Sequence, residues 1–241
     1  MAMKPIPFST PMVQALLNTK PDTWPAEPID PSRPFKSQTR RVAEMPPAVQ
    51  GCDYRYDGDS DGCHYLEQVV DGKPTEMYLD IGKAAYQEGD KFWVRETWRC
   101  MGFDDDGKRI LVQYKDETSQ WVDFDDAMRW KKFAVCSARW KSARHMPCEA
   151  ARLFLEVKEV RMERLQDITE AGAWAEGEQS TCLKPGYRKC VLVGVDKRYT
   201  KECDCANATQ NFAKLWNAIN GKGAWESNPW VWVYEFMRAE G

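Results

Sequence analysis

Hydrophobic residues near both ends of the chain recur with the spacing of an amphipathic helix. Near the C-terminus, apolar residues occupy positions i, i+3, i+4 and i+7 across residues 212–219, and Gly221 follows as a terminator. Near the N-terminus, apolar residues fall on one face of residues 12–17. Ser9 or Thr10 can cap that helix. The pattern therefore predicts one helix at each end.

A third, shorter helix is predicted over residues 171–176. Thr169 or Asp167 would be its N-cap, and Gly177 would end it. It would follow directly after a long strand pattern at 153–162.

Alternation of apolar and polar residues marks the strands. The clearest run is 230–236, which places large aromatic rings on one face and Val, then Glu, on the other. Residues 153–162 alternate in the same way, as a long half-buried strand. Further strand candidates are 91–98, 110–114, 133–140 and 191–195, with a turn at 103–109.

Helices at the ends and near residue 170, with most strands between them, favour the α+β class over alternating βα units. A small closed or half-closed β-barrel with helices against it fits this order best. We expect a single domain over residues 1–241. Its loop-rich insertions are expected at about 21–34, 45–85, 101–131 and 178–207.

Residues 45–75 are predicted to be rich in loops. Within them, Asp57–Gly62 resembles the opening of a calcium-binding loop. Position twelve of that loop is Gln68, where a bidentate Glu is expected, and no helix clearly precedes it. The segment is therefore interpreted as a hairpin turn.

Composition and charge exclude several classes of function. The net charge of −3 argues against broad electrostatic binding of duplex DNA, although a local basic pocket remains open. No secretory signal and no run of about 20 apolar residues is present, so we expect a cytoplasmic protein that does not cross a membrane.

The nine Cys residues have no regular spacing and are interpreted as reduced thiols. Four of them fall in one insertion, where structural zinc is an open alternative although paired CxxC knuckles are absent. These four are Cys182, Cys190, Cys203 and Cys205. We expect no cofactor and no metal.

The segment Lys36–Arg41 is the densest polar stretch, with a lysine, two hydroxyls and two guanidiniums in six residues. A functional interpretation makes this stretch a site presented on a loop, with Arg40 and Arg41 as candidate substrate-binding residues. A structural interpretation leaves a solvated basic loop in which Thr39 bonds to nearby backbone. The pattern alone does not separate the two.

Four more residues are candidate substrate contacts. Arg144 and His145 lie in a basic loop and could donate to a base or phosphate. Trp98 could stack on a base, although strand aromatics are more often core residues. Glu96 is a second carboxylate in a strand pattern, and an ion pair with Arg95 or Arg41 is its other interpretation.

The pattern Lys36-x-x-Thr39-x-Arg41 resembles the signature loop of the ASCH domain, a branch of the PUA-like β-barrel superfamily. Further stretches resemble a subgroup found mostly in phages and prophages. They are Lys4–Thr10, Gly89–Trp98, His145–Pro147, Arg164–Ile168 and Asn228–Val233. Together they run from about residue 4 to residue 236, and the joint pattern is more specific than the short loop.

The resemblance implies a PUA-like barrel that recognises RNA or a modified base or nucleoside in a basic pocket. Some small members of the family are amidohydrolases that deacylate N4-acylated cytidine. By motif position, their lysine, threonine and glutamate correspond to Lys36, Thr39 and Glu176 in this sequence.

Two departures leave alternatives open. A proline-rich insertion separates Lys20 from Lys36, so either lysine could face the pocket, and the chain is larger than the small amidohydrolases. Besides amide hydrolysis, the alternatives are a non-catalytic reader of RNA or modified DNA, a ribonuclease, and a phage accessory or assembly protein that uses the barrel for protein contacts.

Overall fold

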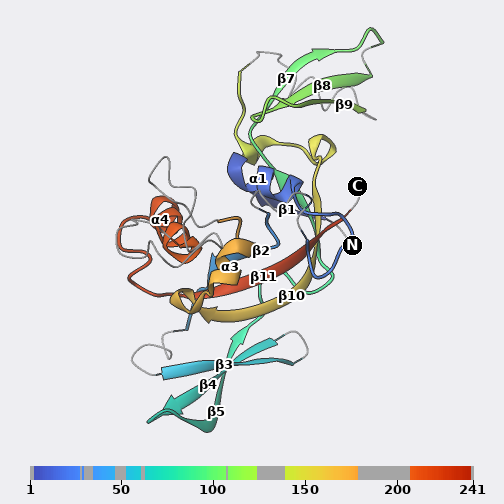
Figure 1. Cartoon of the computed structure of the whole chain (residues 1–241). Coiled ribbons are helices and arrows are strands. Elements are labelled where there is room, and N and C mark those ends of the chain that lie inside the picture. The colour runs from blue at the N-terminus through green and yellow to red at the C-terminus, as the bar shows by residue number, and fades with distance from the viewer. Residues whose placement is uncertain are drawn as a thin grey trace, which may run out of the picture. The chain divides into compact units, whose positions relative to one another are not determined.

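A computed structural model describes most of the chain. The described residues are 3–27, 29, 35–46, 53–60, 63–106, 108–123, 139–178 and 207–239. They form three β-sheets with a few helices, which confirms the α+β class (Figure 1). No helix within these residues has the length and apolar character needed to cross a membrane.

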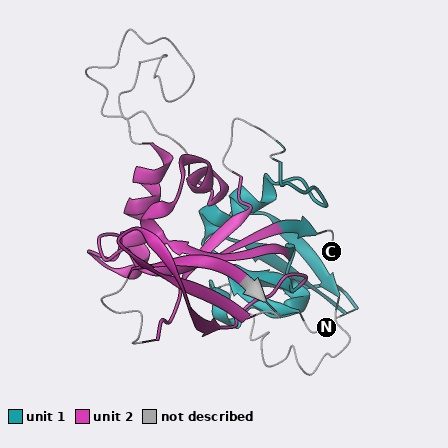
Figure 2. Cartoon of the chain, turned by 90° about the horizontal axis from the view of Figure 1, so that it is seen from below, with its two compact units in different colours: residues 1–33, 90–156, 237–241 teal, residues 34–89, 157–236 magenta. Residues whose placement is uncertain are grey.

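The chain forms two compact units (Figure 2). Unit 1 comprises residues 1–33, 90–156 and 237–241, and unit 2 comprises 34–89 and 157–236. The largest sheet has the strand order β1-β6-β10-β11-β2, and β10 (Phe154–Arg164) and β11 (Trp230–Ala239) each contribute residues to both units.

Unit 1 contains β1 (Lys4–Pro7), which pairs in parallel with β6 (Lys91–Arg95). The helix α1 (Thr10–Leu17) was predicted, and it has a proline in its first turn. Of the two predicted caps, Ser9 occupies the N-cap position, but its side chain makes no capping hydrogen bond. It buries Val13, Ala15 and Leu16.

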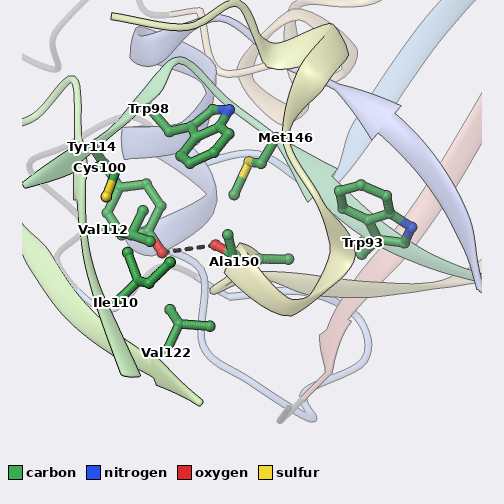
Figure 3. Packing of buried hydrophobic residues seen from close by; sticks show 10 residues of the cluster. Trp93, Trp98, Cys100, Ile110, Val112, Tyr114, Val122, Met146 and Ala150 are labelled. Atoms are coloured by element: carbon green, nitrogen blue, oxygen red, sulfur yellow. Dashed lines mark hydrogen bonds between the residues drawn. The ribbon is translucent and has the colours of Figure 1, made fainter. Parts of the chain in front are cut away.

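Unit 1 also contains a three-stranded antiparallel sheet. Its strands are β7 (Trp98–Phe103), β8 (Arg109–Tyr114) and β9 (Ser119–Asp123). Alternate residues of β8 (Ile110, Val112 and Tyr114) are buried together with Trp98 (Figure 3). The Tyr114 hydroxyl donates to the Ala150 carbonyl at 2.7 Å, which satisfies its polar group inside this core.

In unit 2, a second antiparallel sheet occupies a region predicted to be rich in loops. Its strands are β3 (Asp53–Ser60), β4 (Cys63–Val70) and β5 (Lys73–Gly82). The prediction was wrong because it gave the Asp and Gly residues more weight than the alternating pattern. A bulge between Tyr56 and Gly58, where Gly58 has φ +111°, keeps these residues within a strand. Ser60 pairs with Cys63, so β3 and β4 form a hairpin, but residues 57–60, which were predicted to lie in its turn, belong to β3.

Two helices pack on one face of β11 and β2 (Gln38–Val42) in unit 2. They are α3 (Glu170–Ala175) and α4 (Ala208–Asn220), and both were predicted. Asn207 and Gln210 form a capping box at the start of α4, and Gly221 ends it with φ 101°. The shared core contains Leu165, Ile168, Phe212, Trp216, Val231 and Val233.

Short 3-10 turns complete the described structure at Ala143–His145, Cys148–Ala150 and Leu165–Asp167. Within the described ranges, the three sheets are open and no closed barrel forms. The strand predicted at 191–195 and the four-cysteine cluster lie outside the described residues, as does most of 133–140.

A buried Lys36–Glu176–Arg40 cluster as the candidate functional site

Two local features bring residue 36 to residue 176 within unit 2. Lys36 lies two residues before β2, and both backbone groups of Ser37 are hydrogen-bonded. Its N–H donates to the Ala175 carbonyl at 2.8 Å, and its carbonyl accepts from the Phe236 N–H at 2.9 Å. The segment is thereby fixed between the end of α3 and the edge of β11.

The ends of α3 fix the position of Glu176. At the start, the Thr169 hydroxyl accepts from the Gly172 N–H at 3.0 Å, so Thr169 is the predicted cap. At the other end, Gly177 adopts φ 96° and donates to the Trp174 carbonyl, while Glu178 donates to the Ala173 carbonyl. This is a Schellman motif, and it makes Glu176 the C-cap.

Lys36 and Glu176 form a buried ion pair. The Lys36 Nζ lies 2.7 Å from Glu176 Oε2 and 2.9 Å from the Glu176 carbonyl oxygen. The Arg40 Nη1 donates to the other carboxylate oxygen, Oε1, at 3.0 Å. The exposed fractions of the three side chains are 0% for Lys36, 3% for Glu176 and 1% for Arg40. Two cations therefore share one carboxylate away from water.

Arg40 also belongs to a ring of polar side chains. Its Nε and Nη2 lie 2.8 and 2.7 Å from Glu163 Oε1, and its Nη1 reaches the Gln38 Oε1 at 3.4 Å. Gln38 donates to Glu235, Arg161 donates to the same Glu235 oxygen, and Arg161 lies 3.6 Å from Glu163. The ring closes on Arg40, so its guanidinium is held on several sides.

Burial and nearby charges shift the protonation equilibria at the site. Burial lowers the pKa of Lys36; the charge of Glu176 and its hydrogen bond oppose this, while Arg41 and Arg40 lower it further. Burial raises the pKa of the half-buried Glu178, where the Lys36 charge lowers it and the Glu176 charge raises it. A neutral Lys36 amine is therefore easier to form than in water.

Thr39 and Arg41 lie on a different face of β2 from Gln38 and Arg40, because strand residues alternate. Thr39 pairs with Tyr234 and Arg41 with Trp232 in the ladder. Among the described residues, the buried Thr39 side chain takes no part in the hydrogen bonds that join Lys36, Glu176 and Arg40.

The aromatic face of β11 lies next to these two residues. The His64 and Trp232 rings are 4.6 Å apart, and Tyr86 meets Tyr234 edge to face at 5.2 Å. Burial raises the pKa of Tyr234 to about 12. Trp230 and Trp232 are buried, which agrees with their interpretation as core residues.

Lys20, the alternative lysine, bonds to Glu27 at 2.6 Å in unit 1, and both side chains are largely exposed. Lys36 is therefore the lysine that contacts Glu176.

The remaining predicted contacts lie in unit 1. Glu96 is buried, and both its oxygens accept from Arg152 at 2.8 and 2.7 Å, which corrects the expected pairing with Arg95 or Arg41. Trp98 is completely buried, so its ring has no exposed face on which a base could stack. Arg144 and His145 are exposed in a 3-10 turn, where the Arg144 N–H donates to Ser142 Oγ.

Sequence reasoning missed Glu163, Arg161 and Glu235. The signal was present, because Glu159, Arg161 and Glu163 alternate with buried Val160 and Met162 along β10. An alternating charged face on a half-buried strand indicates a polar network. Among the described residues, no group of three or more His, Cys, Asp or Glu side chains has the arrangement of a metal site.

Comparisons of this chain with protein-family profiles, curated proteins and solved structures gave no match.

Proposed function

We propose that this protein is an ASCH-type, PUA-like protein that recognises a nucleic-acid component, such as a modified base or nucleoside, at the Lys36–Glu176–Arg40 cluster. The observation that carries the proposal is the 2.7 Å ion pair between Lys36 and Glu176. These residues are 140 positions apart in the chain, and the ASCH resemblance assigns a role to each of them. A lysine whose pKa is lowered by burial is typical of a functional site.

Ligand access would involve the half-buried groups next to the pair. Arg41 and Glu178 lie close enough to Lys36 to interact with its charge, and neither is fully buried. The Arg41 guanidinium would bind a carbonyl or phosphate oxygen, and the Glu178 carboxyl would accept from an exocyclic amine. Lys36 and Glu176 would then act on the ligand's bond between that carbonyl carbon and that amine nitrogen.

The proposed reaction is hydrolysis of an N4-acylated cytidine. A proton moves from Lys36 to Glu176 across the 2.7 Å hydrogen bond, which gives a neutral amine and a carboxylic acid. The amine takes a proton from water as the hydroxide adds to the acyl carbon. Glu176 protonates the leaving N4 nitrogen as the C–N bond breaks. The products are cytidine and the carboxylic acid, and the ion pair is restored.

Water is the proposed nucleophile. Among the described residues, Thr39, the nucleophile that the resemblance implies, takes no part in the hydrogen bonds that join Lys36, Glu176 and Arg40. The variant Thr39→Val separates the two choices, because it removes the hydroxyl and retains the side-chain volume. Turnover by a folded Thr39→Val protein agrees with attack by water, and its loss assigns the attack to Thr39.

The test is a turnover assay with N4-acetylcytidine, followed by chromatography of the released cytidine. Purified protein is expected to release cytidine and acetate, and Glu176→Gln to reduce kcat by about 100-fold or more, since it removes the proton donor. Glu67→Gln is the matched control, because Glu67 is also a buried glutamate of unit 2, and its Oε2 lies 2.6 Å from Arg55. No turnover by the unmodified protein, or equal turnover by Glu176→Gln, would contradict the reaction.

A binding role without turnover is the second candidate. It is favoured by the fact that both oxygens of Glu176 already accept hydrogen bonds. Binding of short RNA or modified DNA that weakens with salt, and is lost in Arg41→Ala without any product, would assign this role.

A further inference from the structure

Arg40 connects Glu176 to the ring of polar side chains. Its Nη1 donates to Glu176 Oε1, and its Nε and Nη2 contact Glu163 Oε1. The Phe212 ring lies 5.9 Å from the guanidinium carbon. Arg40 was a candidate substrate ligand from the sequence, but its side chain is 1% exposed and its donors are bonded to protein. A ligand would have to displace these bonds to reach it.

The geometry around Glu176 explains what Arg40 can do. Glu176 caps a six-residue helix, so its side chain leaves the helix where the backbone turns. Without a second partner, the carboxylate could rotate and offer both oxygens to the Lys36 ammonium. With Arg40 in place, Oε1 is occupied and Oε2 alone faces Lys36.

We propose that Arg40 is a positioning residue that holds one oxygen of Glu176, so that only the other oxygen serves Lys36. Arginine suits this task because its planar guanidinium group bridges Glu176 and Glu163 and does not lose its proton at ordinary pH. The proposal rests on the proposed function for its effect on turnover. Its effect on Lys36 does not depend on turnover.

Gly172 provides a way to disturb Arg40 without changing any charge. A Cβ at this position would lie 3.1 Å from the Arg40 Nη2 and 3.2 Å from Ile168 Cγ1. Gly172→Ala therefore presses on the guanidinium, while alanine itself favours a helix. This variant remains informative where Arg40→Met fails to fold.

The experiment compares Arg40→Met, Arg40→Lys and Gly172→Ala with the matched control Arg55→Met. Arg55 also binds a buried glutamate in unit 2, since its Nη2 lies 2.6 Å from Glu67 Oε2. Two readouts are taken on each protein: the pH–rate profile with N4-acetylcytidine, and the titration of the Lys36 ¹³Cε signal by NMR in lysine-labelled protein.

Removing Arg40 should raise the pKa of Lys36, because it removes a nearby cation and releases Glu176 to pair fully with the lysine. The reaction starts from the pair in which Lys36 is protonated, so the alkaline limb of the pH–rate profile, where Lys36 loses its proton, should move to higher pH. We expect kcat to fall by about 10- to 100-fold with little change in KM. Arg40→Lys should recover part of both effects, Gly172→Ala should show a smaller shift of the same sign, and Arg55→Met should show neither.

Two results decide the proposal. A Lys36 titration in Arg40→Met that coincides with that of Arg55→Met would overturn it and leave Arg40 with a structural role only. A raised Lys36 pKa supports it. If the unmodified protein releases no cytidine, the proposed reaction fails by itself, and the NMR titration still decides the role of Arg40.

Discussion

Each of the two compact units contains a buried cluster built around a glutamate, and the two clusters differ in the balance of charge. In unit 1, a single cation, Arg152, serves two acids: it binds both oxygens of Glu96 and lies 2.8 Å from Asp116. In unit 2, two cations, Lys36 and Arg40, share Glu176. In unit 1, two acids share one cation; in unit 2, two cations share one acid, Glu176, and one of them, Arg40, also binds Glu163.

The difference separates an ion pair suited to holding the fold from one suited to chemistry. Arginine keeps its proton under all ordinary conditions, so the cation of the Arg152–Glu96 pair cannot act as a base. Lysine can lose its proton when it is buried beside other cations, and the pKa of Lys36 is lowered for these reasons. A buried lysine pair can also be purely structural, so the comparison has to be tested by stability as well as by activity.

The largest expected effect is on stability in unit 1. Arg152→Met leaves the buried Glu96 without its partner and should reduce the free energy of unfolding by about 3–5 kcal/mol. Lys36→Met should cost about 0–2 kcal/mol, because Glu176 keeps its bond to Arg40 and methionine fills a similar volume. Urea unfolding followed by tryptophan fluorescence measures both. Equal losses in the two variants would remove the distinction between the clusters.

The two clusters should give opposite slopes of stability against pH. The pKa of Lys36 is lowered from 10.5, so between its folded pKa and 10.5 the unfolded chain binds the extra proton. Over that window, this lysine makes the free energy of unfolding rise with pH. Burial raises the pKa of Glu96 from 4.5, so the folded chain binds the extra proton between 4.5 and the folded pKa, and stability falls as pH rises.

Each slope is limited to about 1.4 kcal/mol per pH unit for one proton. The measurement is the difference in free energy of unfolding between the unmodified protein and Lys36→Met on the alkaline side, or Glu96→Gln on the acid side. Contributions of other groups largely cancel in these differences. Slopes of the same sign in the two windows would contradict the assigned pKa directions.

The smallest effect is expected at Lys20. Its bond to Glu27 joins two exposed side chains, and such pairs contribute about 0–1 kcal/mol. Lys20→Met should therefore leave stability nearly unchanged, and cytidine release should continue because Lys36 provides the bond to Glu176. Loss of release in a stable Lys20→Met protein would reassign the lysine role that the sequence left open.

Local patterns predicted the elements that carry the site. The spacing of apolar residues located α4, alternation located β10 and β11, and Thr169 and Gly177 marked the two ends of α3. These features depend on neighbouring residues, so they can be read from a short window of sequence. The sheet β3–β5 was missed because its strands contain Asp and Gly residues that usually signal turns.

Contacts between distant segments were harder to predict. The pairing of Lys36 with Glu176 was suggested by the ASCH resemblance, since no local pattern links residues 140 positions apart. Arg40 was assigned to a substrate because a basic run suggests exposure, yet strand alternation and Glu163 place it inside. The sequence suggested Arg95 or Arg41 as the partner of Glu96, whereas in the structure Glu96 pairs with Arg152.

The most direct test of the account measures N4-acetylcytidine turnover in one variant of each cluster, normalised to the folded fraction of each protein. Lys36→Met should remain largely folded and lose turnover by about 100-fold or more, because the base is gone. Arg152→Lys cannot form the bidentate pair of hydrogen bonds to Glu96, so this variant should be less stable. Its turnover per folded molecule should be unchanged. Turnover that is unchanged in Lys36→Met would contradict the central claim that Lys36 and Glu176 form the functional centre.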